Sequence, residues 1–387
     1  MPKALAYLVV GAGFSGAVVA RELAEHGNNH VLVMDARPHI AGNCHTARDE
    51  ATKVMQHVYG PHIFNTDLVE VWNYVHRFGK LRPFINRVKA HARQGIFSLP
   101  INLLTINQFF GKQFSPAQAR AFVASLGDPS IGEPANFEEQ ALKFVGRQLY
   151  DAFFYGYTRK QWGCEPRELP ASILKRLPVR FNYDDNYYNT AYQGIPENGY
   201  TSIIENILDH PGIDVRLNTK FDPKDGAGYR HVFYTGPIDA YFGFNEGRLS
   251  YRTVTFERIE AEGDYQGTAV INYTDLAVPY TRIHEHKHFT PWEEHQRTVA
   301  FREYSKATGP QDVPYYPVRN QQDKATLSRY VAQARTLKGI SFLGRLATYR
   351  YLDMDDVIDE ALTFAHDFLK AETGGNSPPV FSIDPNR

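Results

Sequence analysis

The stretch Leu5–Gly16, which reads LAYLVVGAGFSG, is the strongest indication of fold in this chain. Its apolar first half predicts a strand, its glycines predict a tight turn, and the residues up to about His26 predict a helix. A second apolar run, Val31–Met34, predicts another strand and ends directly before Asp35. Strand, glycine turn, helix, strand and acid in this order form a dinucleotide-binding fingerprint, so the sequence predicts a Rossmann-like domain.

Each glycine of the fingerprint has its own expected role. Gly11 permits the turn, Gly13 lets a pyrophosphate approach the backbone, and Gly16 lets the helix pack closely on the strand. The helix N-terminus offers free N–H groups to the phosphates, and we expect Asp35 to accept hydrogen bonds from a ribose hydroxyl. An uncharged stretch near the N-terminus is also typical of a signal peptide or membrane anchor. Glycines at turn spacing and a length below that of a membrane span favour the nucleotide interpretation.

The composition indicates a large enzyme-like chain without a charged partner. The 387 residues suffice for two or three domains, and 42 basic residues balance 43 acidic ones. This balance, without a basic tract, argues against a nucleic-acid-binding protein. Two distant cysteines, Cys44 and Cys164, provide neither a disulfide framework nor a zinc site and are typical of a cytoplasmic protein.

Periodicity further along the chain predicts a helical insert and a separate sheet. Capping signals at Asn102, Ser115 and Asn136 open three helices, and we expect the last of them to end at Gly156. A mixed region follows, with a helix at 200–208 and strands at 213–217 and 231–234. Runs rich in β-branched and aromatic residues then predict an antiparallel sheet from strands at 253–256, 269–272, 281–289 and 298–301.

Two segments carry residues suited to binding chemistry. Trp162, beside basic residues in YTRKQWG, could stack a nucleobase, or it could equally be a core residue with solvated charges around it. His284, His286 and His288 would share one face of the predicted strand at 281–289, which raises the possibility of a zinc site. Successive residues on one face lie about 7 Å apart, so convergence on one ion is improbable and we expect no metal. We favour Arg282, just before this run, as an anion clamp.

The sequence contains no common motif of a hydrolase or a nucleoside triphosphatase. It contains no GxSxG, HExxH or Walker motif, so we expect a cofactor to carry the difficult chemistry.

Taken together and in this order, several segments resemble the bacterial UDP-galactopyranose mutase family. The matching stretches are GAGFSG, GPHIF, GYTRKQW, LPASILKRLPVR, YTGPIDAYF, TRIHEHKHF and GRLATYRYLDMD, and they span nearly the whole chain. The resemblance implies an α/β protein: a Rossmann-like FAD-binding domain with an inserted helical bundle and an antiparallel β-sheet domain. It places the FAD domain in residues 1–85, 193–245 and 317–387, the helical domain in 98–180 with a mobile substrate loop at about 164–176, and the sheet domain in 86–97, 181–192 and 246–316.

The resemblance also implies site residues, position by position. Catalytic roles fall on Arg176, Arg282 and His62. The residues expected to bind FAD are Gly11, Gly13, Phe14, Ser15, Gly16, Asp35, Asn43, His62, Thr235, Gly236, Arg345, Leu352 and Asp353. The residues expected to bind the substrate are Asn86, Phe153, Phe154, Tyr157, Trp162, Arg176, Tyr187, Arg282, Tyr316 and Tyr351.

The activity implied by the resemblance is interconversion of UDP-galactopyranose and UDP-galactofuranose, which supplies galactofuranose for cell-surface glycans. Reduced FAD would attack the anomeric carbon through N5, UDP would leave, and a flavin iminium would let the sugar open and reclose. The family further implies a cytoplasmic homodimer that binds a nucleotide sugar and no membrane. Three alternatives stay open: an FAD-dependent oxidoreductase of the amine-oxidase type, an NAD-dependent dehydrogenase, and a nucleotide-sensing protein without catalysis.

Overall fold

A parallel sheet with helices on both faces forms the dinucleotide-binding part of the protein. The structure, a computed structural model, describes residues 6–27, 29–171, 173 and 179–386. The parallel sheet has the strand order β10 (Ile213–Arg216), β2 (Val31–Met34), β1 (Tyr7–Val10), β11 (His231–Tyr234) and β17 (Ile340–Phe342). Helix α1 (Phe14–Gly27) connects β1 to β2, as the fingerprint predicts.

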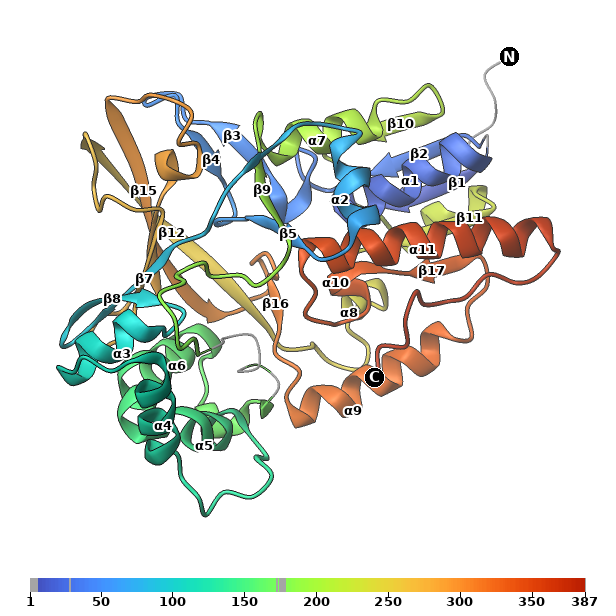
Figure 1. Ribbon diagram of the computed structural model, residues 1–387. Coiled ribbons are helices and arrows are strands. Elements are labelled where there is room, and N and C mark those ends of the chain that lie inside the picture. Colours follow the sequence, from blue (N-terminus) through green and yellow to red (C-terminus); the bar gives the residue numbers. More distant parts are fainter. Residues whose placement is uncertain (1–5, 28, 172, 174–178, 387) are drawn as a thin grey trace.

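Both faces of this sheet are buried, because alternate side chains of each strand enter different cores. Tyr7 and Val9 point into one core, which α1, α7 (Gly199–Leu208) and α11 (Met354–Thr373) complete. Leu8 and Val10 point into the other, completed by α8 (Ile238–Tyr241), α9 (Gln321–Ala334) and α10 (Gly344–Ala347). Figure 1 shows α11 and α1 together on one side and α9 on its own below them. Burial on both faces explains why the strands read as continuous apolar runs.

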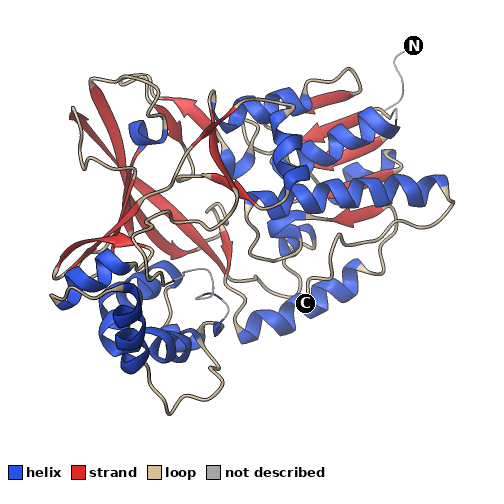
Figure 2. Ribbon diagram, in the orientation of Figure 1, coloured by secondary structure: helices blue, strands red, loops and turns tan. Residues whose placement is uncertain are grey.

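The helical bundle lies at the far end of the molecule from the N-terminus (Figure 2). It comprises α3 (Leu103–Phe110), α4 (Pro116–Leu126), α5 (Phe137–Leu149), a π-helical segment (Tyr150–Tyr155) and α6 (Gly156–Trp162). The predicted caps are present: Asn102 and Asn136 accept backbone N–H bonds at their helix starts, and Ser115 forms a capping box with Gln118. These caps satisfy donors that a helix start leaves free.

A second sheet packs against the bundle, in contact with α3, α6 and the π-helical segment. Its strand order is β16 (Tyr316–Pro317), β12 (Tyr251–Glu262), β15 (Arg297–Ala307), β14 (Arg282–Glu285), β13 (Val270–Tyr273), β7 (Val88–Ala92) and β8 (Gly95–Leu99). Every neighbouring pair is antiparallel except β13 and β7, which run parallel. Small sheets and a helix fill the connection to the first domain: β3 (Thr46–Arg48) with β4 (Met55–His57), β5 (Phe64–Thr66) with β9 (Tyr192–Pro196) and β6 (Leu81–Pro83), and α2 (Val69–His76).

The structure corrects two local predictions. Gly156 does not end a helix. Helical structure continues through α6, and that helix is capped by Gly163, whose φ of 69° is left-handed. A Cβ on Gly156 would overlap the carbonyl oxygen of Thr274, so this glycine serves a close approach rather than a cap. The predicted strand at 281–289 ends at Glu285, and His286–Phe289 forms a 3₁₀ turn. Among the described helices, none is both long and apolar enough to cross a membrane.

Candidate functional site

The glycine turn between β1 and α1 is shaped as a phosphate cradle. Gly11 has a φ of 110°, and a side chain there would overlap Thr235 Oγ1; one on Gly16 would overlap the carbonyl oxygen of Gly11. The nearest atom to a Cβ on Gly13 is the Cα of Gly42 at 3.8 Å, so space remains beside Gly13. The turn is therefore tight where it packs and open where a pyrophosphate would pass, which fits a dinucleotide.

Asp35 holds the turn in place. Its carboxylate accepts the N–H of Ala12 at 2.8 Å and the N–H of Arg37 at 2.9 Å. Arg37 in turn donates to Asn43 Oδ1 at 2.9 Å, and the cofactor role expected of Asn43 stays a prediction. The ribose contact expected of Asp35 stays a prediction.

Two other predicted cofactor segments converge on the cradle. Thr235 follows β11 and donates its N–H and its hydroxyl to Val10 O at 3.0 and 2.8 Å. Gly236 follows at the same strand end. Gly344, at the start of α10, lies so close to Ser15 that a Cβ on it would overlap the serine hydroxyl. This contact places the neighbouring Arg345 near the first turn of α1, which begins with Phe14 and Ser15.

His62 is a neutral imidazole with one defined tautomer. Its Nδ1 donates to the carbonyl of Gly60 at 2.8 Å, because a carbonyl can only accept. Burial lowers the pKa of His62 to about 4, against a weaker opposing effect of the Gly60 hydrogen bond. Nε2 is therefore an unprotonated acceptor at neutral pH.

Two stacked tyrosine rings lie against the guanidinium of Arg345. The rings of Tyr316 and Tyr351 stack with centroids 5.6 Å apart, and the Arg345 guanidinium lies 5.6 and 5.3 Å from these two rings. Arg345 Nε also donates to Leu352 O at 3.0 Å. Trp162, at the end of α6, reaches Tyr351 with a centroid separation of 6.3 Å. The bundle and the C-terminal segment thus meet through aromatic side chains, and Asp353 follows directly as the residue before α11.

Arg282 is the charged centre of this region. Its Nε donates to Glu303 Oε2 at 2.8 Å, and the Glu303 side chain is 0% exposed. Burial is the largest single influence and opposes the charged guanidinium, but the Glu303 carboxylate together with Tyr157 and Tyr316 outweighs it and raises the pKa of Arg282. Among the described residues, no hydrogen bond engages the two Nη groups, which are free for a ligand.

Three phenols face this guanidinium. Burial raises the pKa of Tyr157, Tyr187 and Tyr316, and in each case the nearby positive charge of Arg282 opposes the rise. The value for Tyr187 is about 12. All three side chains therefore stay protonated and can donate hydrogen bonds to an anion.

Three of the predicted substrate residues, Phe153, Phe154 and Asn86, are buried. Phe153 and Phe154 are buried in the bundle core, where Phe153 packs edge-on against Phe97 at 5.3 Å. Asn86 is buried next to Tyr187, whose N–H donates to the Asn86 carbonyl at 2.8 Å. The side-chain Oδ1 of Asn86 has no partner among the described residues. Substrate roles for these residues stay predictions.

Arg176 and part of the loop at 164–176 lie outside the described residues. The roles expected of Arg176 and of this loop therefore stay predictions.

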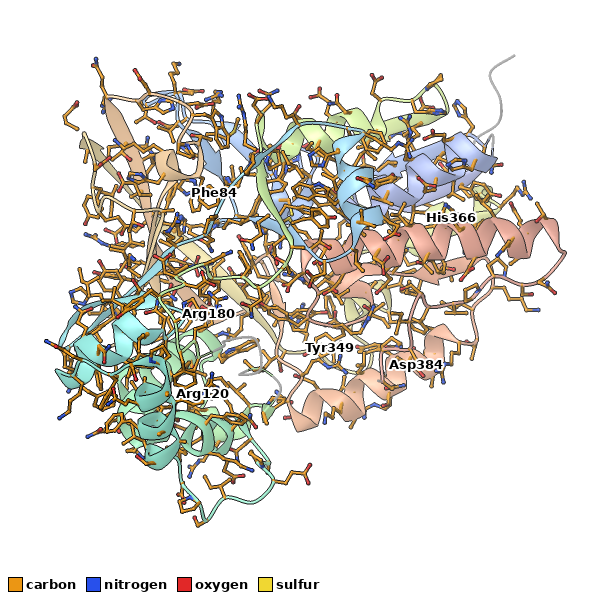
Figure 3. The ribbon with its side chains drawn as sticks, viewed as in Figure 1. Phe84, Arg120, Arg180, Tyr349, His366 and Asp384 are labelled. Atoms are coloured by element: carbon orange, nitrogen blue, oxygen red, sulfur yellow. The ribbon has the colours of Figure 1, made fainter. Side chains whose placement is uncertain are left out.

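Two basic residues that position the site were not singled out from the sequence. Arg180 donates to Tyr188 O at 3.1 Å and also to the Asn186 carbonyl, so it organises the loop that carries Tyr187; Figure 3 labels it where the bundle meets the sheet. Lys160 donates to four carbonyls of the turn 273–280, at 2.7 to 3.0 Å. The role of Lys160 has no local signal, since all its partners are more than 100 positions away.

The three histidines considered as zinc ligands do not converge. The 3₁₀ turn sends His288 toward Asp264 and Glu285, and this trio is the one potential metal group found among the described residues. Glu285 already accepts the N–H groups of Tyr265, Gln266 and Gly267, and Lys287 pairs with Asp264 at 2.5 Å. These contacts make the trio a hydrogen-bonded turn.

Comparison with known proteins places this chain in a family. A family model described as UDP-galactopyranose mutase matches residues 152–351, and a model of an NAD(P)-binding Rossmann-like domain matches residues 9–78. A probable UDP-galactopyranose mutase of Klebsiella pneumoniae is 56% identical over 376 residues, covering 97% of this chain and 98% of that protein. A dTDP-fucopyranose mutase of Escherichia coli is 51% identical over 370 residues, covering 94% and 98%.

A solved structure agrees in fold. The crystal structure of a reduced UDP-galactopyranose mutase superposes with a TM-score of 0.72 over 95% of this chain and 96% of that chain, at 14% identity. The shared fold confirms the predicted architecture of a Rossmann-like domain combined with parallel and antiparallel sheets.

Proposed function

Because the chain belongs to the UDP-galactopyranose mutase family, we propose that it interconverts UDP-galactopyranose and UDP-galactofuranose on a reduced FAD. The enzyme is an isomerase, and the family and its Rossmann-like domain indicate a flavin cofactor. The observation that best supports the proposed substrate is the Arg282 guanidinium. It is held by Glu303 through Nε, has free Nη groups, and is faced by three protonated tyrosines.

The cradle of β1 and α1 suits the pyrophosphate of FAD, since the turn is open beside Gly13 and the helix start presents N–H groups. When bound in its reduced form, the flavin supplies a nucleophile for the anomeric carbon and undergoes no net redox change. His62 presents an unprotonated Nε2 that can hold a proton near the ring.

The substrate side of the site stabilises a leaving diphosphate. As the bond from the anomeric carbon to UDP breaks, negative charge grows on the diphosphate, and the Arg282 Nη groups offer a planar pair of donors to it. Tyr157, Tyr187 and Tyr316 donate further hydrogen bonds and exclude water from this charge. We propose that Arg176 adds a second guanidinium, that its loop closes over the substrate, and that Trp162 stacks on uracil.

A second candidate substrate is dTDP-fucopyranose, because a relative with that activity in its name is 51% identical. UDP-galactose carries two hydroxyls that dTDP-fucose lacks, one on the ribose and one on the sugar. The buried, unpartnered Oδ1 of Asn86 is an acceptor that such a hydroxyl would satisfy. A site with an unpaired buried acceptor discriminates against an analogue without the donor, so the UDP sugar is favoured.

The test is to incubate the dithionite-reduced protein with UDP-galactofuranose and, separately, with dTDP-fucofuranose, and to separate the products by chromatography. We expect conversion of both, with a kcat/KM at least about tenfold higher for the UDP sugar. The reverse order would assign the dTDP sugar. Substrate-driven reduction of oxidised flavin, with an oxidised sugar as product, would indicate an oxidoreductase instead. A cytoplasmic homodimer remains part of the proposal on the strength of the family resemblance.

A further inference from the structure

Three buried histidines form a hydrogen-bonded chain beside the site, and the reaction as described does not use them. His57 lies at the end of β4, His284 in β14, and His286 directly after β14. Their side chains are 2%, 0% and 0% exposed. The sequence pattern raised the possibility that His284 and His286 bind a metal, whereas in the structure the two rings are hydrogen-bonded to each other.

Hydrogen bonds fix the tautomers of His286 and His284. The backbone N–H of His57 donates to Nδ1 of His286 at 3.0 Å, so the ring proton of His286 is on Nε2. That Nε2 lies 2.8 Å from Nδ1 of His284 and must be the donor. His284 therefore accepts through Nδ1 and carries its own proton on Nε2. All the roles follow from one backbone donor.

The free end of the chain points at the partner of Arg282. The protonated Nε2 of His284 is 3.6 Å from Oε2 of Glu303, the same oxygen that accepts from Arg282 Nε at 2.8 Å. Nε2 of His284 is buried and has no other partner among the described residues. A shift of less than 1 Å would bring donor and carboxylate to an ordinary hydrogen-bond distance.

The other end of the chain reaches the loop that carries His62. The N–H of His62 donates to Nδ1 of His57 at 2.9 Å. Gly60 in the same loop lies against Glu303, since a Cβ on it would be 3.6 Å from Oε2. The loop on the cofactor side and the ion pair on the substrate side are thus in contact with the same row of imidazoles.

We propose that His284 is a positioning residue for Arg282: its Nε2–H faces Glu303 and holds that carboxylate where it aligns the guanidinium for the substrate diphosphate. The proposal rests on the proposed function, because it assigns a diphosphate to Arg282. Glu303 is completely buried, so its carboxylate oxygens need hydrogen-bond donors from the protein on more than one side. Arg282 supplies one donor, Thr281 Oγ1 lies 3.4 Å from the other oxygen, and His284 closes the remaining side.

Two substitutions separate the ends of the His284 ring. In His284→Gln the amide nitrogen occupies the place of Nε2 and keeps the donor toward Glu303. In His284→Asn the amide oxygen occupies the place of Nδ1 and keeps the acceptor for His286, but nothing reaches Glu303. The two variants are matched in polarity, and each loses one of the two contacts.

The measurement is the Kd of UDP for the oxidised protein by calorimetry, followed by kcat and KM of the reduced enzyme. We expect His284→Asn to weaken UDP binding about five- to thirtyfold and to lower kcat/KM by at least the same factor. His284→Gln should stay within about twofold of the wild type. In a Glu303→Leu background the Asn substitution should have no further effect, because leucine offers no acceptor to His284 and the contact is already gone.

Equal UDP affinity in the Asn and Gln variants would overturn the proposal, whether both match the wild type or both are weakened equally. If His284→Asn does not fold, His284→Thr suits a strand, also lacks a donor within reach of Glu303, and takes its place with the same expected result. The UDP measurement requires no turnover. A wild type that binds UDP but converts no sugar would contradict the proposed function and still decide the role of His284.

Discussion

Replacing Gly156 with alanine tests whether the close approach of α6 to the sheet domain positions the site. The new Cβ would overlap Thr274 O and lie 3.3 Å from both the carbonyl carbon of Thr274 and the N–H nitrogen of Leu276. All three are backbone atoms, so no side chain can rotate away. The helix and the turn must separate by roughly 1 Å before the contact becomes an ordinary one.

Two opposing effects set the change in stability. Overpacking costs about 1–3 kcal/mol, and alanine in place of glycine inside a helix returns about 1 kcal/mol. The free energy of unfolding should therefore fall by about 0–2 kcal/mol. Activity should fall more, because α6 carries Tyr157 and Trp162, and a displacement of about 1 Å at a catalytic site can cost about a hundredfold in rate.

The assay compares kcat/KM of the reduced enzyme with urea unfolding of the same preparation. Gly132→Ala is the matched control, since a Cβ at Gly132 meets nothing within 4 Å and its backbone is not left-handed. We expect a ten- to hundredfold loss for Gly156→Ala and none for the control. Activity of Gly156→Ala within twofold of the wild type would refute the claim that this contact positions α6.

Three further predictions address charge. Arg282→Ala should remove most turnover yet leave flavin absorbance unchanged, as should Arg176→Ala; near-normal turnover in both variants would remove the arginines from the mechanism. Lys160→Met should lower the melting temperature, because four carbonyls of one turn lose their common donor, and an unchanged melting curve would contradict this. Burial lowers the pKa of His231 to about 4, so this group's contribution to stability is full above pH 6.5 and is lost as the pH falls toward 4. The free energy of unfolding, measured by thermal unfolding, should decrease by up to about 3 kcal/mol over this pH range. His231→Gln should make this dependence on pH shallower.

Local sequence patterns predicted the parts of the fold that local physics controls. The cradle needs glycines at fixed spacing, and the caps at Asn102, Ser115 and Asn136 act within four residues, so both were visible in the sequence. The Gly156 prediction failed because the partner that requires a glycine there, Thr274, is distant in sequence. A glycine kept for close packing and one kept for a helix end look the same in a single sequence.

The histidine run shows the same limit at the site. Period-two spacing predicted one face for His284, His286 and His288, but the strand ends at Glu285, whose carboxylate accepts three backbone N–H groups from the turn at 265–267. The chain then turns, and His286 meets His57 from a strand more than 200 positions earlier. Such pairings depend on tertiary structure and are not visible in the spacing of residues along the chain.

The proposed function requires that the flavin is reduced during turnover and undergoes no net oxidation. The most direct measurement is an anaerobic time course of the pre-reduced protein with UDP-galactofuranose, recording product by chromatography and flavin absorbance on the same samples. We predict many equivalents of UDP-galactopyranose per flavin while the flavin stays reduced, and no product from the oxidised protein. Flavin reoxidation in step with product, or conversion at the same rate by oxidised protein, would contradict the account.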